Sequence, residues 1–377
     1  MPHAHHHPRA TRLLGRALAL TAVVTIAVAA PAWGKTWSGE TLPSGLGVLG
    51  GISCVNHSVK HKKTERRCVA VGQDTAKKLG AIVVSNDGGK TWGSMAVPAG
   101  IGGLFGVSCA SFSRCVAAGE TDAADGFHAA TVATTDGGKN WLRQQLPAGH
   151  QAIGWISCRS KRCVAGGLRW GNTLLVTSDG GTSWSPKTLP LHGGCTGFCV
   201  AYAEDSGTLA SKSTGYAVGG NQCGGASVTQ CPGVIWKSTN GGDSWKLVFE
   251  GQPFVDAISC VDSSHCWAAA ATFKTGVMLR SANGGKTWKR QTLPSFSGFF
   301  NSISCVRASK ADRCLAVGQN PGGTAPVIAA TSDGGSHWKL DSAPSGTGSL
   351  FGVDVVGHGG RAVGQDPTAT SALAIQR

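Results

Sequence analysis

An eight-residue motif occurs six times in this 377-residue chain and constrains its fold more than any other feature. Each copy has Ser or Thr, then Asp or Asn two residues later, Gly two residues further and Trp three beyond that. Asp and Asn side chains bond backbone N–H groups two residues on, and Gly adopts positive φ, so each copy is predicted to be a tight turn between strands. The copies are SNDGGKTW (85–92), TTDGGKNW (134–141), TSDGGTSW (177–184), STNGGDSW (238–245), SANGGKTW (281–288) and TSDGGSHW (331–338).

The sequence between the motifs also repeats, about every 50 residues. An apolar run precedes each motif. Between motifs lie a strand ending in Ser-Cys, a short loop, and a second strand that opens with Cys, such as CVAVG at Cys68 or CLAVG at Cys314. Each unit therefore contains four antiparallel strands, which is the content of one propeller blade. The prediction is an all-β fold, a seven-bladed β-propeller of four-stranded antiparallel blades.

The two ends of the chain each carry part of the seventh unit. KTWSGETLP (35–43) matches KTWKRQTLP (286–294), but no turn motif precedes it. The segment 350–377 contains the first three strands of a unit and ends where a motif should begin. A ring of sheets has an exposed edge wherever it is cut, so we expect the N-terminal strand to close the last blade. Residues 35–377 then form a single propeller domain.

Residues 1–34 are predicted to be a signal peptide. Arg9, Arg12 and Arg16 precede an apolar run over 17–30, and small residues follow it. A helix of that length spans about 21 Å, which is shorter than the ~30 Å hydrocarbon core of a bilayer. We therefore expect cleavage between Ala30 and Lys35 and a secreted or extracytoplasmic protein. Retention of the leader as a membrane anchor is the alternative.

The chain has 14 Cys, and an even number in an exported protein predicts disulfides rather than a metal site. The split blade has Val355 and Gly360 where the two cysteines of other blades lie, so both are missing together, as expected of bonded partners. The predicted pairs are Cys54–Cys68, Cys109–Cys115, Cys158–Cys163, Cys260–Cys266 and Cys305–Cys314. The remaining Cys195, Cys199, Cys223 and Cys231 allow three pairings, of which Cys195–Cys199 with Cys223–Cys231 is favoured.

The motif S/T-x-D-x-G-x-T/S-W resembles the Asp-box, or bacterial neuraminidase repeat (BNR). This repeat is typical of sialidases, sortilin-type propellers, xyloglucan-hydrolysing propellers and photosystem II stability/assembly factor-like proteins. Whole-blade spacing and second strands such as GYAVGG (215–220) are most similar to the last group. The resemblance implies ligand sites on the face opposite the motifs. It also implies a structural role for the motif residues Asp87, Trp92, Asp136, Trp141, Asp179, Trp184, Asn240, Trp245, Asn283, Trp288, Asp333 and Trp338.

Candidate ligand-binding residues lie on the face opposite the motifs. Polar residues recur directly after the second strand of a blade, where they would surround the mouth of the central channel. Solvated loop positions are the alternative reading. The candidates for this rim are Gln73, Asp74, Glu120, His128, Arg169, Trp170, Asn221, Gln319 and Gln365.

No residue is predicted to be catalytic, and no cofactor or metal is expected. A sialidase needs an arginine cluster and a Tyr beside a carboxylate; Tyr202 lies near Glu204, but the arginines are lacking. A glycosidase needs two carboxyls about 5–9.5 Å apart. Glu120, Asp122 and Asp125 could supply them, although acidic residues in one loop are more often a solvated turn.

Part of the net charge of +14 is concentrated in the first Cys loop. A basic loop attracts an anionic cell-surface polymer, and a solvated loop is the alternative. Nucleic acid is not expected, because the chain is exported and aromatic residues do not alternate with these charges. The patch consists of Lys60, Lys62, Lys63, Arg66 and Arg67.

The sequence thus predicts an exported, non-catalytic, monomeric propeller that binds a protein or glycan as a scaffold in the manner of an assembly factor. The alternative is a carbohydrate-active enzyme, a glycoside hydrolase of sialidase-like fold, with its site at the channel mouth. The two differ in one observable, because an enzyme needs buried carboxylates of shifted pKa that face one pocket.

Overall fold

The computed structural model describes residues 36–57, 65–74, 79–167, 172–190, 199–223, 232–251, 254–271, 275–309, 311–357 and 359–377. In these ranges the chain forms seven four-stranded antiparallel sheets, which confirms the predicted seven-bladed propeller. Blade 1 is β2 (Leu46–His57), β3 (Glu65–Asp74), β4 (Gly80–Ser85) and β5 (Gly93–Met95); blade 2 is β6 (Ile101–Cys109), β7 (Cys115–Thr121), β8 (Ala129–Thr134) and β9 (Leu142–Arg143); blade 3 is β10 (Trp155–Arg159), β11 (Arg162–Gly166), β12 (Thr173–Thr177) and β13 (Ser185–Thr188).

The remaining blades follow the same order from the first strand to the fourth. Blade 4 is β14 (Cys199–Leu209), β15 (Gly215–Cys223), β16 (Gly233–Ser238) and β17 (Lys246–Gly251); blade 5 is β18 (Phe254–Cys260), β19 (Cys266–Ala271), β20 (Gly276–Ser281) and β21 (Lys289–Gln291); blade 6 is β22 (Phe299–Val306), β23 (Arg313–Gln319), β24 (Pro326–Thr331) and β25 (Lys339–Leu340); blade 7 is β26 (Leu350–Val356), β27 (Gly359–Gln365), β28 (Ala372–Gln376) and β1 (Ser38–Gly39).

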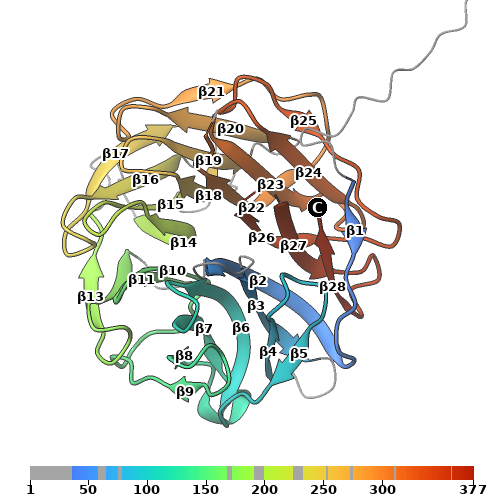
Figure 1. Ribbon diagram of the computed structural model, residues 1–377. Helices are drawn as coiled ribbons and strands as arrows, with labels where there is room; N and C mark the ends of the chain where they lie inside the picture. Colours follow the sequence, from blue (N-terminus) through green and yellow to red (C-terminus); the bar gives the residue numbers. More distant parts are fainter. Residues whose placement is uncertain are drawn as a thin grey trace, which may run out of the picture. The chain divides into compact units, whose positions relative to one another are not determined.

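The first strand of each blade lies nearest the centre of the ring, and the fourth lies at the periphery (Figure 1). First strands of consecutive blades contact each other, and contact between β2 and β26 closes the ring. Since all strands are antiparallel, the first–second and third–fourth turns of every blade share one face, here called the turn face. The second–third loops and the connections between blades form the opposite face, here called the loop face.

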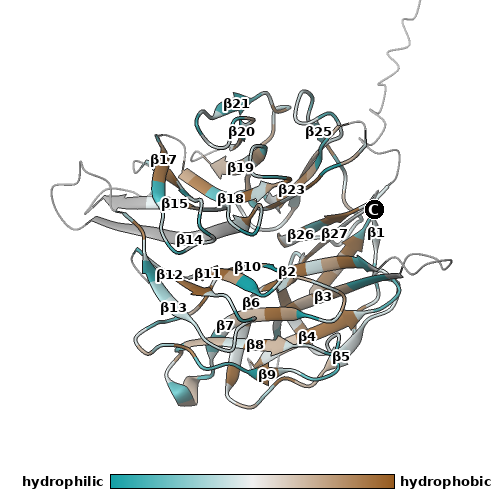
Figure 2. Ribbon diagram, turned by 60° about the vertical axis from the view of Figure 1, so that its left-hand side comes forward, coloured by the Kyte–Doolittle hydropathy of each residue, from teal (hydrophilic) through white to brown (hydrophobic). Residues whose placement is uncertain are grey.

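The core lies between adjacent blades. One cluster combines Val69 and Ile82 of blade 1 with Val107, Val132 and Trp141 of blade 2. Apolar residues are concentrated in the strands, while the turns are more polar (Figure 2). Burial of this apolar surface is the main favourable contribution to the fold. Among the described residues, no helix has the length and apolarity to cross a membrane.

Each eight-residue motif forms a hydrogen-bonded turn, as in the copy at 134–141. The hydroxyl of Thr134 accepts a bond from the Gly138 N–H (3.0 Å) and donates to Asp136 Oδ1 (2.8 Å). Asp136 Oδ1 also accepts from the N–H groups of Lys139 (3.0 Å) and Asn140 (3.1 Å). These donors lie three and four residues after the Asp. The expected distance of two residues is wrong, because two consecutive glycines at positive φ, 80° and 87°, turn the chain back later.

A glycine near the end of the second strand allows close packing against a bulge in the first strand. The pairing of β2 with β3 shifts register twice, between Leu46 and Val48 and between Leu49 and Gly51. A Cβ atom on Gly72 would lie 1.8 Å from the carbonyl oxygen of Val48. Glycine is required at such a position because no side-chain carbon fits there.

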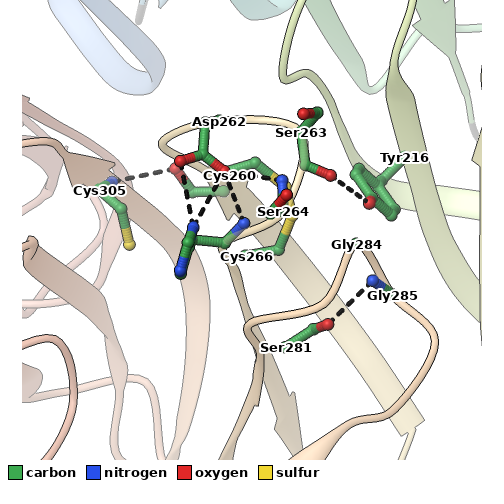
Figure 3. The surroundings of a disulfide bond; sticks show 12 residues. Tyr216, Cys260, Asp262, Ser263, Ser264, Cys266, Ser281, Gly284, Gly285 and Cys305 are labelled. Carbon is green, nitrogen blue, oxygen red and sulfur yellow. Dashed lines mark hydrogen bonds and ion pairs between the residues drawn. A yellow bond between two sulfur atoms is a disulfide. The ribbon is translucent and has the colours of Figure 1, made fainter.

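Five disulfides join the first two strands within one blade, and the five predicted pairs are confirmed. In blade 5, Cys260 and Cys266 are direct cross-strand partners that enclose a short turn (Figure 3). The carboxylate of Asp262 accepts bonds there from the N–H groups of Ser264 (2.7 Å) and His265 (2.8 Å). In blade 5 the disulfide thus closes a turn that side-chain hydrogen bonds already shape.

The cysteine positions of blades 4 and 7 differ from this pattern. Val355 and Gly360 are cross-strand partners in blade 7, and Leu315 of blade 6 occupies the space that a side chain on Gly360 would need. In blade 4 the backbone register sets Cys199 opposite Cys223. The other two cysteines of the favoured pairings, Cys195 and Cys231, lie outside the described residues.

A chain of hydrogen bonds links the first strands of adjacent blades. The serine of each Ser-Cys pair accepts a bond from the backbone N–H of the corresponding position in the next blade. At the closure of the ring, Asp354 takes the place of serine and accepts from the Cys54 N–H at 2.6 Å. The serine bonds are Cys109 N–H to Ser53, Cys158 N–H to Ser108, Leu209 N–H to Ser157, Cys305 N–H to Ser259 and Val355 N–H to Ser304, at 2.9–3.1 Å.

The N-terminal strand closes blade 7, as predicted. β1 pairs with β28 through Ser38 opposite Gln376 and Gly39 opposite Ile375 (Figure 1). Beside it, Trp37 is buried, and its Nε1 donates to Asp341 of blade 6 at 3.3 Å. The C-terminal Arg377 pairs with the same carboxylate.

On the other side of this seam, Glu40 contacts blade 1. Its Oε2 accepts a bond from Trp92 Nε1 at 2.9 Å, and its Oε1 lies 3.3 Å from Nε of Arg361. Burial raises the pKa of Glu40 to about 7, while the Arg361 charge opposes the rise. The seam therefore relies on buried carboxyls where the chain starts and ends.

Candidate functional site

The predicted rim residues are distributed around the loop face rather than gathered at one point. Gln319 and Gln365 end the second strands of blades 6 and 7, and Gln73 is the last residue but one of β3 in blade 1. All three are half-buried. Glu120 lies near the end of β7. Arg169 and Trp170 lie outside the described residues, as does the side chain of Asn221.

Some acidic residues of the loop face shape their own loops. Asp74 Oδ1 accepts a bond from the Leu79 N–H at 3.4 Å. Asp122 caps the 3-10 helix η1 (Ala123–Asp125), accepting from the Asp125 N–H at 3.3 Å. These contacts favour the interpretation of Asp74 and Asp122 as loop-forming residues.

An open pocket of about 530 Å³ lies on the loop face of blade 2. It forms where the loop from β7 to β8 meets the connection from β9 to β10, and a bond from the Ala129 N–H to the His150 carbonyl (3.0 Å) joins the two segments. No carboxylate lines it; its polar side chains are one guanidinium, two imidazoles and two amides. The lining residues are His128, Ala129, Arg143, Gln144, Gln145, Leu146, Pro147, Ala148, Gly149 and His150.

The loop before the pocket holds an exposed aromatic ring in a strained conformation. η1 ends at Gly126, which has φ 81°, and the next residue, Phe127, has φ 59°. Positive φ is rare for a bulky residue and costs about 1–3 kcal/mol. The Phe127 side chain is 53% exposed. The next residue, His128, is fixed by backbone bonds with Thr121: its N–H donates to Oγ1 (2.9 Å), and its carbonyl accepts from the Thr121 N–H (2.7 Å).

Arg143 extends from the outer strand β9 along the same loop. Its Nη1 lies 3.3 Å from Asp125 Oδ2, and both side chains are about half exposed. The preceding residue, Leu142, is 68% exposed. Among the described residues the large hydrophobic side chains that are exposed are Phe127, Leu142 and Leu340. Phe127 and Leu142 directly precede the lining residues His128 and Arg143 in the chain.

Sequence reasoning identified only His128 among the pocket residues. The segment from β9 to β10 contributed no predicted site residue, although Arg143 at the end of β9 is followed closely by Gln144, Gln145 and His150. A run of polar side chains in a blade connection is the signal that could have found the pocket.

The predicted basic patch is only partly described. Lys60, Lys62 and Lys63 lie outside the described residues. Arg66 donates to the Val356 carbonyl of blade 7 (3.0 Å), and Arg67 donates to the Phe112 carbonyl of blade 2 (2.5 Å). Both arginines therefore bridge blades.

Cations elsewhere on the turn face do the same. Arg162 of blade 3 donates to the Gly241 carbonyl in the motif of blade 4 (3.0 Å), and Lys237 of blade 4 donates to the Gly284 carbonyl in the motif of blade 5 (2.6 Å). Part of the basic excess is thereby explained by contacts between blades.

The carboxyls whose pKa is raised by burial lie apart from the pocket. They are Glu40 at the seam, Asp354 in β26 and Asp256 in β18. Burial raises the pKa of Asp354 to about 6 although it accepts bonds from Cys54 and Ser304. Within the described ranges, no three His, Cys, Asp or Glu side chains gather as a metal site would require.

Comparison with known proteins identifies the fold but no family. No family model and no curated protein matches the sequence. A structure of YCF48 bound to D1 peptide superposes with a TM-score of 0.60 at 14% identity, covering 91% of this chain and 96% of that one. YCF48 from Cyanidioschyzon merolae gives 0.57 at 17% identity, covering 91% and 98%. U3-55K gives 0.58 at 11% identity, covering 90% and 98%. At these identities the likeness is one of fold.

Proposed function

We propose that this chain is an exported, non-catalytic propeller that binds a segment of a partner protein on its loop face. The observation that carries the proposal is the blade 2 pocket beside Phe127, an exposed aromatic residue held at positive φ. Backbone strain at exposed residues is concentrated at functional sites. Large aromatic side chains are also the residues that most often anchor a protein partner.

Export rests on the leader and on the cysteines. Five disulfides are consistent with an oxidising, extracytoplasmic compartment. We propose that residues 1–34 are removed and that the mature chain begins close to Lys35. N-terminal sequencing of the secreted protein tests this, because a start between positions 31 and 35 is expected and an intact Met1 would contradict it.

Binding is favoured over glycoside hydrolysis by the chemistry of the pocket. A hydrolase of this kind needs two carboxyls that flank the scissile bond, and the pocket lining contains none. The buried carboxyls Glu40, Asp256 and Asp354 belong to the seam and to first strands. A protein ligand is favoured over a glycan because one propeller of similar fold, YCF48, has been solved with a peptide bound.

Photo-crosslinking tests the proposal directly. A benzophenone amino acid replaces Phe127 in the secreted protein, and in a second variant it replaces Lys139, an exposed residue of the turn face in the same blade. The variant at 127 should crosslink a discrete protein in the source cells, and the variant at 139 should not. Equal crosslinking from both positions would overturn the proposal, as would strong turnover of a glycoside or binding to a glycan array alone.

A further inference from the structure

The lining of the blade 2 pocket is selective in charge. Arg143 carries its only permanent charge, and the other polar groups are the imidazoles of His128 and His150 and the amides of Gln144 and Gln145. An anionic group would meet only neutral or cationic side chains in this lining, and the neighbouring carboxylate is Asp125, the ion-pair partner of Arg143. A cationic ligand group would find no carboxylate among them.

Building on the binding function above, we propose that this pocket receives a carboxylate of an acidic peptide segment, with the Arg143 guanidinium as its main partner. Arginine is suited to this role because its planar fork of donors matches a carboxylate in two parallel bonds. The ion pair with Asp125 joins Oδ2 to Nη1 alone, one of the three guanidinium nitrogens.

Displacing Asp125 costs little. Both partners of the ion pair are about half exposed, at 44% and 47%, and exposed ion pairs contribute little to stability. Asp125 is therefore suited to hold the guanidinium in place until a ligand carboxylate replaces it. Gly100 lies next to the pair, since a Cβ atom there would be 3.1 Å from Nη1 of Arg143.

The two imidazoles supply further donors from fixed positions. The backbone of His128 is held on both sides by Thr121, and the His150 carbonyl is bonded to Ala129. Burial lowers the pKa of His150, so its ring is neutral near pH 7.

The proposed protein partner favours a peptide over an acidic polysaccharide. Phe127 directly precedes His128 of the lining and is 53% exposed, so an apolar side chain of the peptide can contact it. The ligand class is thus a peptide with an acidic residue next to an apolar one.

Two matched peptides test the inference on the intact secreted protein. The probes are acetyl-Leu-Glu-Phe-Glu-amide and its counterpart with both Glu replaced by Gln, titrated by NMR with the His side-chain signals as reporters. The Glu peptide should bind at least about tenfold more tightly, and Arg143→Gln should remove that preference. Arg143→Lys should retain part of it, because the charge remains while the fork is lost. Lys139→Gln should leave binding unchanged.

The outcomes separate this inference from the proposed function. Equal affinity for both peptides would overturn the carboxylate inference, while crosslinking from position 127 would still support a protein partner. Preferential binding of an oligoglucuronate over the Glu peptide would overturn the peptide assignment. Thermal unfolding of each variant verifies that lost binding is not lost folding.

Discussion

Glu40 is expected to make the propeller less stable as the pH rises, and Glu40→Gln should abolish that dependence. Its side chain is fully buried, and burial raises its pKa from 4.5 to about 7, while Arg361 lowers it in part. The folded protein therefore holds this proton more tightly than the unfolded chain does. Stability from this group is fully present below pH 4.5 and is lost as the pH rises through 7.

The size of the effect follows from the shift. One pKa unit corresponds to about 1.4 kcal/mol, so the free energy of unfolding should fall by about 2–3 kcal/mol between pH 5 and pH 8 because of Glu40. Gln has nearly the shape of the neutral acid and does not titrate. The free energy of unfolding of Glu40→Gln should therefore rise by that amount relative to the wild type between pH 5 and pH 8, whatever the difference in stability between the two proteins at pH 5.

Urea unfolding followed by tryptophan fluorescence at pH 5, 6, 7 and 8 measures the difference, with the disulfides kept oxidised. Gln291→Glu is the reciprocal variant, because Gln291 lies three residues after Trp288 as Glu40 does after Trp37. It should add a second pH dependence of the same sign. Curves that stay parallel for wild type and Glu40→Gln would refute the buried, proton-binding role of this carboxyl.

Three further substitutions test the packing and the turns by urea unfolding. Gly72→Ala should cost about 3 kcal/mol, because its Cβ would lie 1.8 Å from the Val48 carbonyl oxygen, whereas Gly322→Ala, with its nearest atom at 3.8 Å, should cost nothing measurable. Thr134→Val should lower the free energy of unfolding by about 1–3 kcal/mol, because it leaves the buried N–H of Gly138 unpaired. Three other copies of the motif have Ser at this position, so Thr134→Ser should keep the bond, and a similar loss of stability in that variant would contradict this reasoning. Burial raises the pKa of Asp354 to about 6, so the free energy of unfolding of Asp354→Ser should rise by about 1 kcal/mol relative to that of the wild type between pH 5 and pH 8. The absence of this relative rise would exclude a buried titrating carboxyl.

The fold could be predicted because its determinants are local and repeated. The motif fixes a turn through contacts within eight residues, as at Thr134 and Asp136. Cross-strand cysteines fix the register of a hairpin, and Trp37 marks the strand that completes the last blade. Each of these signals recurs in the sequence, so an error in one copy is corrected by the others.

The contacts between blades could not be predicted in the same way. Arg67 and Phe112 are 45 residues apart, and the sequence gives no direction for a side chain at that distance. Within a blade, the repeated glycine of the second strand, Gly72 in CVAVG, is visible in the sequence, but its close approach to a carbonyl oxygen across a bulge is not. The pocket was missed for a related reason: Arg143 and His128 come together only through the packing of two loops of blade 2.

The seam residues were found only in part. Trp37 was recognised from its repeat, but its partner Asp341 and the neighbouring Arg377 were not, because the residue three after the repeat Trp is acidic in only two units, at Glu40 and Asp341. Positions that differ from the repeat carry no repeat signal, and they occur here where the two ends of the propeller meet.

The hydrogen bonds between first strands join each blade only to the next one. Among the described residues, the bonds that the five serines from Ser53 to Ser304 accept have the same form at each joint where they occur, so an added repeat with the same serine could make the same bond. The number of blades is therefore set by the number of repeats in the sequence, and none of these bonds specifies it. Blade 7, which unites the two ends of the propeller, differs from this pattern on both sides, with Asp341 facing it from blade 6 and with Glu40 and Asp354 facing blade 1. The closure of the ring thus depends on carboxyls, whereas the bonds that the five serines accept depend on hydroxyl groups that recur along the chain.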